Sequence, residues 1–256
     1  MATTQEILDE INAKIADVQA RIGAIGSDFQ TGTDEGDVLF GSTFSDSFLD
    51  GLGEDDRLFG RFGDDVLNGG DGDDLIDGGN GDDILEGNGG EDNIFGKLGD
   101  DFLAGGADND LLDGGLGDDQ LDGGDGDDQL TGGPDNDVLL GGNGLDSLTG
   151  AGGNQTEGSP QQDILIGGLL DDAGNPVPDG SSDLFVLGND NGSFYTSAGD
   201  EDFALILGFE AGVDQLQLSP VGNFSLSTAA AFSPVDTIIF DGGDRVAIIV
   251  GVDLTV

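Results

Sequence analysis

An aspartate recurs every nine residues through the middle of this chain, without interruption from Asp65 to Asp146. Each of these ten aspartates has a glycine five residues before it and an aliphatic residue two residues after it. The pattern G-x-x-x-x-D-x-U-x, in which U is Leu or Ile, holds from Gly60 to Thr149, and Gly69–Asp77 (GGDGDDLID) shows it plainly. A fixed short period means that one structural unit stacks on copies of itself, so the pattern predicts a solenoid.

Each unit is predicted to be a glycine-rich turn followed by a short strand. Glycine at positions one, two and four permits positive φ and close backbone approach. Positions seven to nine are expected to form the strand, with position eight pointing inward and positions seven and nine pointing outward. Position eight therefore predicts one continuous aliphatic ladder, made of Leu67, Ile76, Leu85, Ile94, Leu103, Leu112, Leu121, Leu130, Leu139 and Leu148.

Two units make one coil of eighteen residues, so residues eighteen apart are expected to stack at about the 4.8 Å spacing of neighbouring strands. The position-six aspartates then fall into two columns. One column is Asp65, Asp83, Asp101, Asp119 and Asp137, and the other is Asp74, Asp92, Asp110, Asp128 and Asp146. Two carboxylates at this separation repel by roughly 0.9 kcal/mol even in water.

The chain carries 54 Asp and Glu against 6 Lys and Arg, for a formal net charge of −48. Such a charge opposes a compact state unless counter-charge is bound. Carboxylate and carbonyl oxygens prefer a hard divalent cation such as Ca²⁺, which takes six to eight oxygen ligands. Binding between successive turns would then supply folding free energy.

These residues resemble the RTX (hemolysin-type) family, whose nonapeptide G-G-x-G-x-D-x-U-x forms a right-handed parallel β-roll with Ca²⁺ between its turns. The resemblance is close over 60–149 and looser over 32–188. It implies that the ten stacked aspartates ligate Ca²⁺ together with turn carbonyls, in about eight or more sites. Further ligands are predicted where degenerate units keep the aspartate phase, at Asp37, Asp46, Asp56, Asp163 and Asp183.

Some units depart from the glycine pattern. Position two is Arg61, Asn88 or Lys97 in three units, and position four is Asp108 or Asp135 in two others. Because Asp tolerates the left-handed conformation, these turns are expected to survive. Arg61 and Lys97 are expected to place a positive charge beside a cation site.

The predicted fold is all-β: a parallel β-roll with a short N-terminal α-helix and a C-terminal antiparallel β cap. Residues 1–31 carry one apolar stripe at alternating intervals of three and four, which predicts an amphipathic helix that caps the roll or self-associates. The stripe is Leu8, Ile11, Ile15, Val18, Ile22 and Ile25. Residues 32–188 are predicted as the β-roll, with regular units over 60–149, and 189–256 as short capping strands separated by turns.

The composition excludes several functions. A chain so acidic lacks the basic patches that bind nucleic acid or anionic lipid, and no stretch has the length and apolarity of a membrane span. It contains no His and no Cys, which removes the commonest general base and the thiolate metal sites. The segments outside the repeats leave no room for a catalytic domain, so no enzyme activity is expected.

The start of the chain lacks the features of a cleavable secretion signal. Resemblance to the RTX family implies export by a type I secretion apparatus through an uncleaved C-terminal signal, and hence an extracellular or cell-surface location. A structural or interaction role follows, with self-association or an extracellular matrix or surface partner. Two alternatives stay open: an accessory module or remnant of an RTX toxin or enzyme system, and a matrix or surface-layer adhesin.

Two other classes fit poorly. A disordered tract does not explain an aliphatic residue at the same phase in all ten units. An ice-binding solenoid would need a uniform outward row, whereas position nine varies from unit to unit between acidic, aromatic and aliphatic residues.

Overall fold

The computed structural model describes residues 29–151, 162–171, 175–177, 179–189, 192–193, 203–211, 213–218, 220, 224–229, 236–241 and 244–250. Every regular element in these ranges is a β-strand. The predicted N-terminal helix falls almost entirely on residues 1–28 and so lies outside the described residues. No helix that could cross a membrane is found in the described part of the chain.

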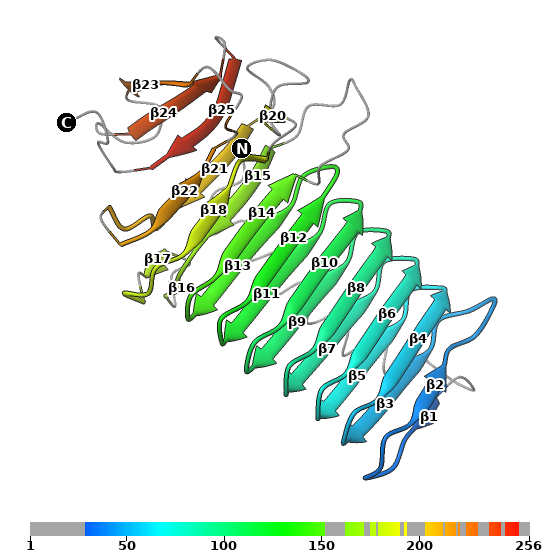
Figure 1. Cartoon of the computed structure of the whole chain (residues 1–256). Coiled ribbons are helices and arrows are strands. Elements are labelled where there is room, and N and C mark those ends of the chain that lie inside the picture. Colours follow the sequence, from blue (N-terminus) through cyan, green and yellow to red (C-terminus); the bar gives the residue numbers. More distant parts are fainter. Residues whose placement is uncertain are drawn as a thin grey trace.

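The strands form an elongated parallel solenoid with two main sheets, and the chain alternates between them (Figure 1). Sheet A runs in the order β1 (Phe29–Thr31), β3 (Phe48–Gly53), β5 (Val66–Asp71), β7 (Ile84–Gly89), β9 (Phe102–Ala107), β11 (Gln120–Asp125), β13 (Val138–Asn143), β15 (Gln162–Ile166), β21 (Phe203–Leu207), β25 (Asp244–Ile249), β24 (Asp236–Asp241) and β23 (Phe224–Ala229). Sheet B runs β2 (Val38–Phe40), β4 (Arg57–Phe62), β6 (Leu75–Asn80), β8 (Asn93–Leu98), β10 (Leu111–Leu116), β12 (Gln129–Gly133), β14 (Ser147–Ala151), β18 (Leu184–Val186) and β22 (Gln215–Gln217).

Two small antiparallel pairs complete the described elements. They are β16 (Leu169–Leu170) with β17 (Pro176–Val177), and β19 (Gly188–Asn189) with β20 (Gly192–Ser193).

The register of the regular units confirms two nonapeptides per coil. Leu67 pairs with Leu85 between β5 and β7, and Ile76 pairs with Ile94 between β6 and β8. The strands are longer than predicted, because most span six residues and continue through positions one to three of the next unit. Glycine at those positions pairs in register too, as Gly70 does with Leu52. The turn is therefore confined to positions four to six.

The core is the predicted aliphatic ladder between the two sheets. All ten position-eight Leu and Ile side chains are buried, and Leu49 and Leu58 extend the ladder toward the N-terminus. Full burial of one such side chain contributes roughly 1.5–3 kcal/mol. Phe185 and Ile206 continue the same core toward the C-terminus.

The solenoid extends beyond the range of recognisable repeats at both ends. β1 begins at Phe29 and pairs in parallel with β3, inside the segment predicted as the N-terminal cap. β21 and β22 continue sheets A and B past residue 188. Beyond them, β25 pairs in parallel with β21, and β24 and β23 add in antiparallel fashion. The predicted C-terminal antiparallel strands are confirmed.

The irregular turns keep the left-handed backbone. Arg61, Asn88 and Lys97 have φ of 82°, 78° and 85°, and Asp108 and Asp135 have φ of 75° and 83°. Asp108 and Asp135 thus keep a positive φ in the turn, and the other three keep it inside strands β4, β7 and β8, at the steric cost that a side chain meets in this region.

Candidate metal centre

The position-six aspartates lie where the sequence places them, in two columns that follow the two sheets. All ten are buried, with exposed fractions of 2 % or less. Their position is set by the turn, which ends at the aspartate and turns its side chain back toward the position-one glycine of the same unit. Burial of so many carboxylates is costly unless each charge is compensated.

Backbone hydrogen bonds between coils supply part of that compensation. The N–H of Asp74 donates to Oδ1 of Asp92 at 2.7 Å, and the N–H of Asp92 donates to Oδ1 of Asp110 at 2.8 Å. In the other column the N–H of Asp83 donates to Oδ1 of Asp101 at 2.7 Å. Each carboxylate therefore accepts a hydrogen bond from the coil before it, and the ladder repeats every eighteen residues.

The second carboxylate oxygen receives no such bond. Oδ2 is buried and accepts no hydrogen bond in Asp56, Asp74, Asp83, Asp92, Asp110, Asp128, Asp137 and Asp146. A buried acceptor without a donor costs about 1–3 kcal/mol, and more when it is charged. These oxygens need either a proton or a cation.

The surroundings of Oδ2 are rich in oxygen. Position-one Gly105 has no side chain, and a Cβ there would collide with Oδ2 of Asp110 and lie 2.7 Å from the carbonyl oxygen of Gly123 in the next coil. The same arrangement recurs at Gly96, where Asp101 and Gly114 contribute the two oxygens. Carboxylate and carbonyl oxygens, without nitrogen or sulfur, fit a hard cation such as Ca²⁺.

Burial raises the pKa of these carboxyl groups. Desolvation raises the pKa of Asp83 to about 8, and that of Asp92 and Asp110 to about 7, against the lowering effect of the backbone hydrogen bond. Desolvation and the neighbouring charge of Asp163 also raise the pKa of Asp137. Burial of the columns thus opposes ionisation of these aspartates, and a bound positive charge would favour it.

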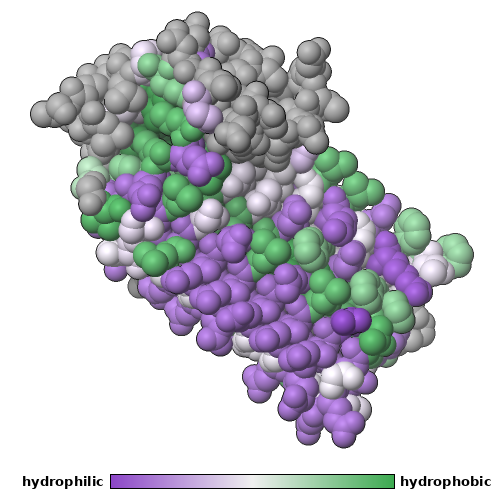
Figure 2. Space-filling model, in the orientation of Figure 1, coloured by the Kyte–Doolittle hydropathy of each residue, from purple (hydrophilic) through white to green (hydrophobic). Residues whose placement is uncertain are grey.

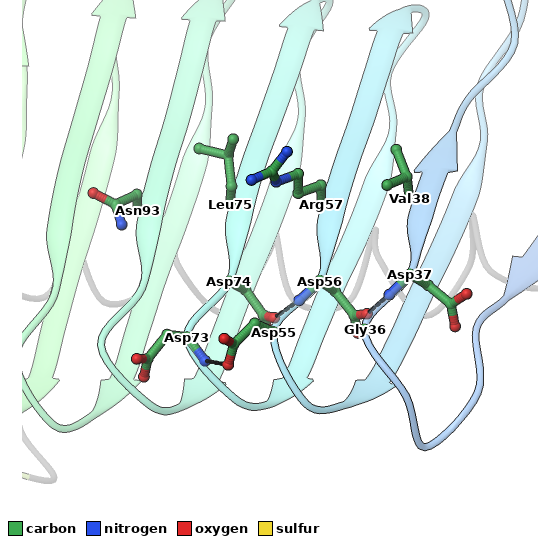
Figure 3. Close-up of a pocket in the computed structure, with 10 residues that line it drawn as sticks. All are labelled: Gly36, Asp37, Val38, Asp55, Asp56, Arg57, Asp73, Asp74, Leu75 and Asn93. Carbon is green, nitrogen blue, oxygen red and sulfur yellow. Dashed lines mark hydrogen bonds between the residues drawn. The ribbon is translucent and has the colours of Figure 1, made fainter.

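A pocket of about 560 Å³ opens over one of these columns near the N-terminal end of the roll. Asp37, Asp56 and Asp74 lie in line there, each linked to the next by a backbone N–H to carboxylate bond (Figure 3). Asp55 and Asp73, one residue earlier in their units, lie beside them, and the N–H of Asp73 donates to Oδ1 of Asp55 at 3.2 Å. This end of the column is therefore accessible from solvent.

The degenerate units join the columns at four of the five predicted positions. Asp37 and Asp56 begin the column on the sheet B side, and Asp183 follows Asp146 in it, whereas Asp163 follows Asp137 on the sheet A side. Asp46 does not fall in phase. The extra residue in 41–50 places buried Ser47 in the column, with its N–H on Oδ1 of Asp65, and leaves Asp46 exposed in the neighbouring column.

One column member was missed by sequence analysis. Oδ1 of Asp214 accepts the N–H of Asp183 at 3.2 Å, so Asp214 continues the sheet B column. No glycine stands five residues before Asp214, and this hid the unit, although Leu216 keeps the aliphatic phase two residues after it. The carboxylate of Asp214 also accepts the N–H of Glu210 at 2.6 Å, which closes the local turn.

Arg61 and Lys97 lie beside aromatic rings, and Nη1 of Arg61 also donates to the carbonyl oxygen of the position-one glycine Gly41 at 3.4 Å. The Arg61 guanidinium lies over the Phe40 ring at 4.6 Å, and the Lys97 ammonium lies over the Phe95 ring at 4.2 Å. Both charges are thus held on the outer face of sheet B by cation–π contacts. That either charge weakens a cation site stays a prediction.

Side chains alone do not form a cage: no group of three or more Asp, Glu, His or Cys side chains that could hold an ion occurs among the described residues. The oxygens that flank each buried carboxylate are backbone carbonyls.

A family model for the RTX calcium-binding nonapeptide repeat (4 copies) matches this part of the chain three times in succession, over residues 50–85, 86–121 and 122–154. No curated protein gives a significant match to the chain.

Proposed function

We propose that the position-six aspartates of the roll bind Ca²⁺ and that this binding drives folding, because residues 50–154 match the model of the RTX calcium-binding nonapeptide repeat. One observation carries the proposal: buried Oδ2 atoms without a hydrogen-bond donor recur in register from Asp56 to Asp146 along the sheet B column, and occur at Asp83 and Asp137 in the sheet A column. A bound cation would satisfy these oxygens and neutralise the columns.

The ligands would be the ten regular aspartates with carbonyl oxygens of adjacent coils, in about eight or more sites. Asp37, Asp56, Asp163, Asp183 and Asp214 would add partial sites at the ends, because they share the column geometry. Asp46 is exposed and lies in the other column, so we assign it no part in this ladder.

Coupling of binding to folding follows from the electrostatics. The columns exist only when the coils stack, so an unfolded chain presents separated carboxylates and no preformed site. Stacking without Ca²⁺ must bury charged or abnormally protonated aspartates, as the raised pKa values of Asp83, Asp92 and Asp110 indicate. The free energy of ion binding is then folding free energy.

The biological setting we propose is a secreted or cell-surface protein with a structural or interaction role and no catalytic activity. Low Ca²⁺ inside a cell would keep the chain extended for export by a type I secretion apparatus, and millimolar Ca²⁺ outside would fold it. The resemblance to the RTX family supports this setting.

A calcium titration followed by circular dichroism tests the proposal. We expect an unfolded spectrum in chelator and a β-sheet spectrum in millimolar Ca²⁺, with several ions bound per chain by calorimetry. Mg²⁺ at the same concentration serves as the control, because it dehydrates reluctantly and demands stricter geometry. A β-sheet spectrum that is identical in chelator and in Ca²⁺ at neutral pH would refute the coupling.

A further inference from the structure

The two sheets differ on their outer faces, where position seven of each unit points away from the core. On sheet A this column is apolar except for Gln120 and is shielded: Val66 and Ile84 are each only 4 % exposed, and Gln120 is 8 % exposed. On sheet B the same column alternates between polar and apolar residues, and Arg57, Asn93 and Gln129 in it are exposed. An outward side chain of a two-sheet solenoid is buried only if something covers it.

Near the C-terminal end, described elements bury the outward side chains of sheet A. There Ile164, Leu205 and Ile248 form a second apolar cluster, with Val138 and Leu170 packed against it. Farther toward the N-terminus, the substantial contacts of β5, β7, β9 and β11 with other described elements are made with neighbours in their own sheet and with strands of sheet B. The described elements in substantial contact with these strands therefore do not account for the burial of Val66 and Ile84.

Residues 1–28 have the sequence and the length to cover these side chains. They are the longest stretch outside the described ranges, and they carry the apolar stripe Leu8, Ile11, Ile15, Val18, Ile22 and Ile25. A helix from Thr3 to Ile25 would be about 34 Å long at 1.5 Å per residue. The distance from β1 to β13 is six strand spacings, or about 29 Å.

The point of attachment also fits. Residue 28 is followed directly by β1, the edge strand of sheet A, and not by a strand of sheet B. Phe29 starts the apolar column itself, since its ring stacks on the ring of Phe48 with centroids 4.8 Å apart. A chain that leaves this edge can cross the outer face of sheet A without passing round the roll.

Charge favours the same placement. Lys14 and Arg21 are two of the six basic residues of the chain, and position nine on sheet A carries Asp50, Glu86 and Asp122 beside the apolar column. Desolvation alone raises the pKa of Asp122 to about 6, and the described elements in substantial contact with β11 are its sheet A neighbours and strands of sheet B. A covering segment with two cations would both desolvate and compensate this acidic rim.

We propose that residues 1–28 dock as an amphipathic helix across the outer face of sheet A, with their apolar stripe on the column that contains Val66, Ile84 and Phe102. The helix belongs to the same chain and lies along the roll axis, so it clamps successive coils together as well as shielding their apolar surface. Sheet B has no such column, and its outer face stays open to solvent.

Limited trypsin digestion in millimolar Ca²⁺ tests the docking, because Lys14 and Arg21 are the only cleavage sites before Arg57. We expect slow cleavage after Lys14 and Arg21 in the native chain, and at least about tenfold faster cleavage in Ile84→Asp, since local opening then becomes more favourable. Leu111→Asp changes the matched position of sheet B and should leave the rate unchanged. Ile84→Thr, a milder change, replaces Ile84→Asp if that variant does not fold.

Deletion of residues 1–28 gives a second readout. The deleted chain should bind a hydrophobic dye or form dimers in Ca²⁺, and Ile84→Asp in the same background should abolish both. Equal cleavage rates in all variants, or a deleted chain that neither binds dye nor associates, would overturn the proposal. Native dimers in which dilution exposes Lys14 and Arg21 would also overturn it, in favour of a second copy as the partner.

Circular dichroism of each variant in Ca²⁺ separates this proposal from the calcium proposal. Docking is judged only among variants that share the native β-sheet spectrum, whereas a native chain without that spectrum contradicts calcium-coupled folding.

Discussion

Positions five and six of the repeat place two acidic columns side by side on each edge of the roll, and the two columns behave in opposite ways. Position six is Asp in every regular unit and is buried. Position five is exposed in every regular unit and varies, with Glu91, Asn109, Asn136 and Leu145 among the aspartates. The residue type is thus constant at the buried acidic position and varies at the exposed one.

The hydrogen bonds of the two columns also run in opposite directions. At position six, the N–H of Asp110 donates to the carboxylate of Asp128 in the following coil. At position five, the N–H of Asp82 donates to the carboxylate of Asp64 in the preceding coil. Both kinds of hydrogen bond thus link successive coils. Of the two positions, only position six has buried carboxylate oxygens without a hydrogen-bond donor, as in Asp92 and Asp110. The difference teaches that acidity alone does not make the candidate metal site; burial within the turn does. Figure 2 shows a broad hydrophilic area along the roll.

The largest expected effect comes from pH in the absence of metal. The folded pKa is about 6 for Asp74, about 7 for Asp92 and about 8 for Asp83, against about 3.9 in an unfolded chain. Because the folded values are higher, the contribution of these groups to stability is complete below the unfolded pKa and is lost as pH rises through about 6 to 8. Chelated protein should therefore gain β structure between about pH 8.5 and pH 5, as measured by circular dichroism.

A control sharpens this prediction. The combined changes Asp74→Asn, Asp92→Asn, Asp110→Asn and Asp128→Asn mimic the neutral acid in the sheet B column, so this variant should lose part of the pH dependence in chelator, whereas Asp83 retains its share. A control variant with four Asp→Asn changes at position five should keep the full pH dependence. If both sets behave alike, the distinction between the columns fails.

The next largest effect is expected from single changes at adjacent residues. Asp83→Asn removes one buried charge, and we expect the midpoint of the calcium titration to rise at least about tenfold, or about 1.4 kcal/mol, with fewer ions bound by calorimetry. Asp82→Asn should shift the midpoint less than about twofold, because the charge lost is exposed and screened. A larger midpoint shift from Asp82→Asn than from Asp83→Asn would assign ion binding to position five instead of position six.

Substitutions of glycine should show a similar contrast between a position beside the buried carboxylate and a position away from it, with smaller effects. A Cβ at Gly87 would collide with Oδ2 of Asp92 and lie 2.7 Å from the carbonyl oxygen of Gly105, whereas at Gly89 the nearest atom is 3.8 Å away. Gly87→Ala should destabilise the calcium-loaded roll by about 1–3 kcal/mol through overpacking, and Gly89→Ala by less than about 0.5 kcal/mol. Chemical denaturation in Ca²⁺ measures both, and equal losses would contradict the packing described here.

The smallest effect concerns the one aliphatic member of position five. Leu145 is 55 % exposed, and its N–H already donates to Oδ1 of Asp127 at 2.9 Å. Leu145→Asp restores the acid without changing that bond, so we expect a stability change below about 0.5 kcal/mol. Thermal melting in Ca²⁺ checks it, and a marked gain in melting temperature would mean that position five also takes part in ion binding.

Much of the fold could be read from the period, because contacts in a solenoid join residues at a constant offset. The same offset predicted the inward ladder from Leu67 to Leu148 and the pairing of Asp65 with Asp83. It failed where the spacing changes. Ser47 takes a place predicted for Asp46 because 41–50 holds an extra residue, and Asp214 joins a column without the glycine that marks the other units.

The sequence by itself determined the coil of eighteen residues, the aliphatic interior and the two rows of aspartates, because each depends only on regular spacing and side-chain polarity. Tertiary structure alone decided which carboxylate oxygen is left without a donor in residues such as Asp92 and Asp110, where Arg61 and Lys97 place their charges, and how strongly the position-seven side chains of the two sheets are exposed. These features depend on atoms brought together from different coils and from distant segments, and no local pattern encodes such long-range packing.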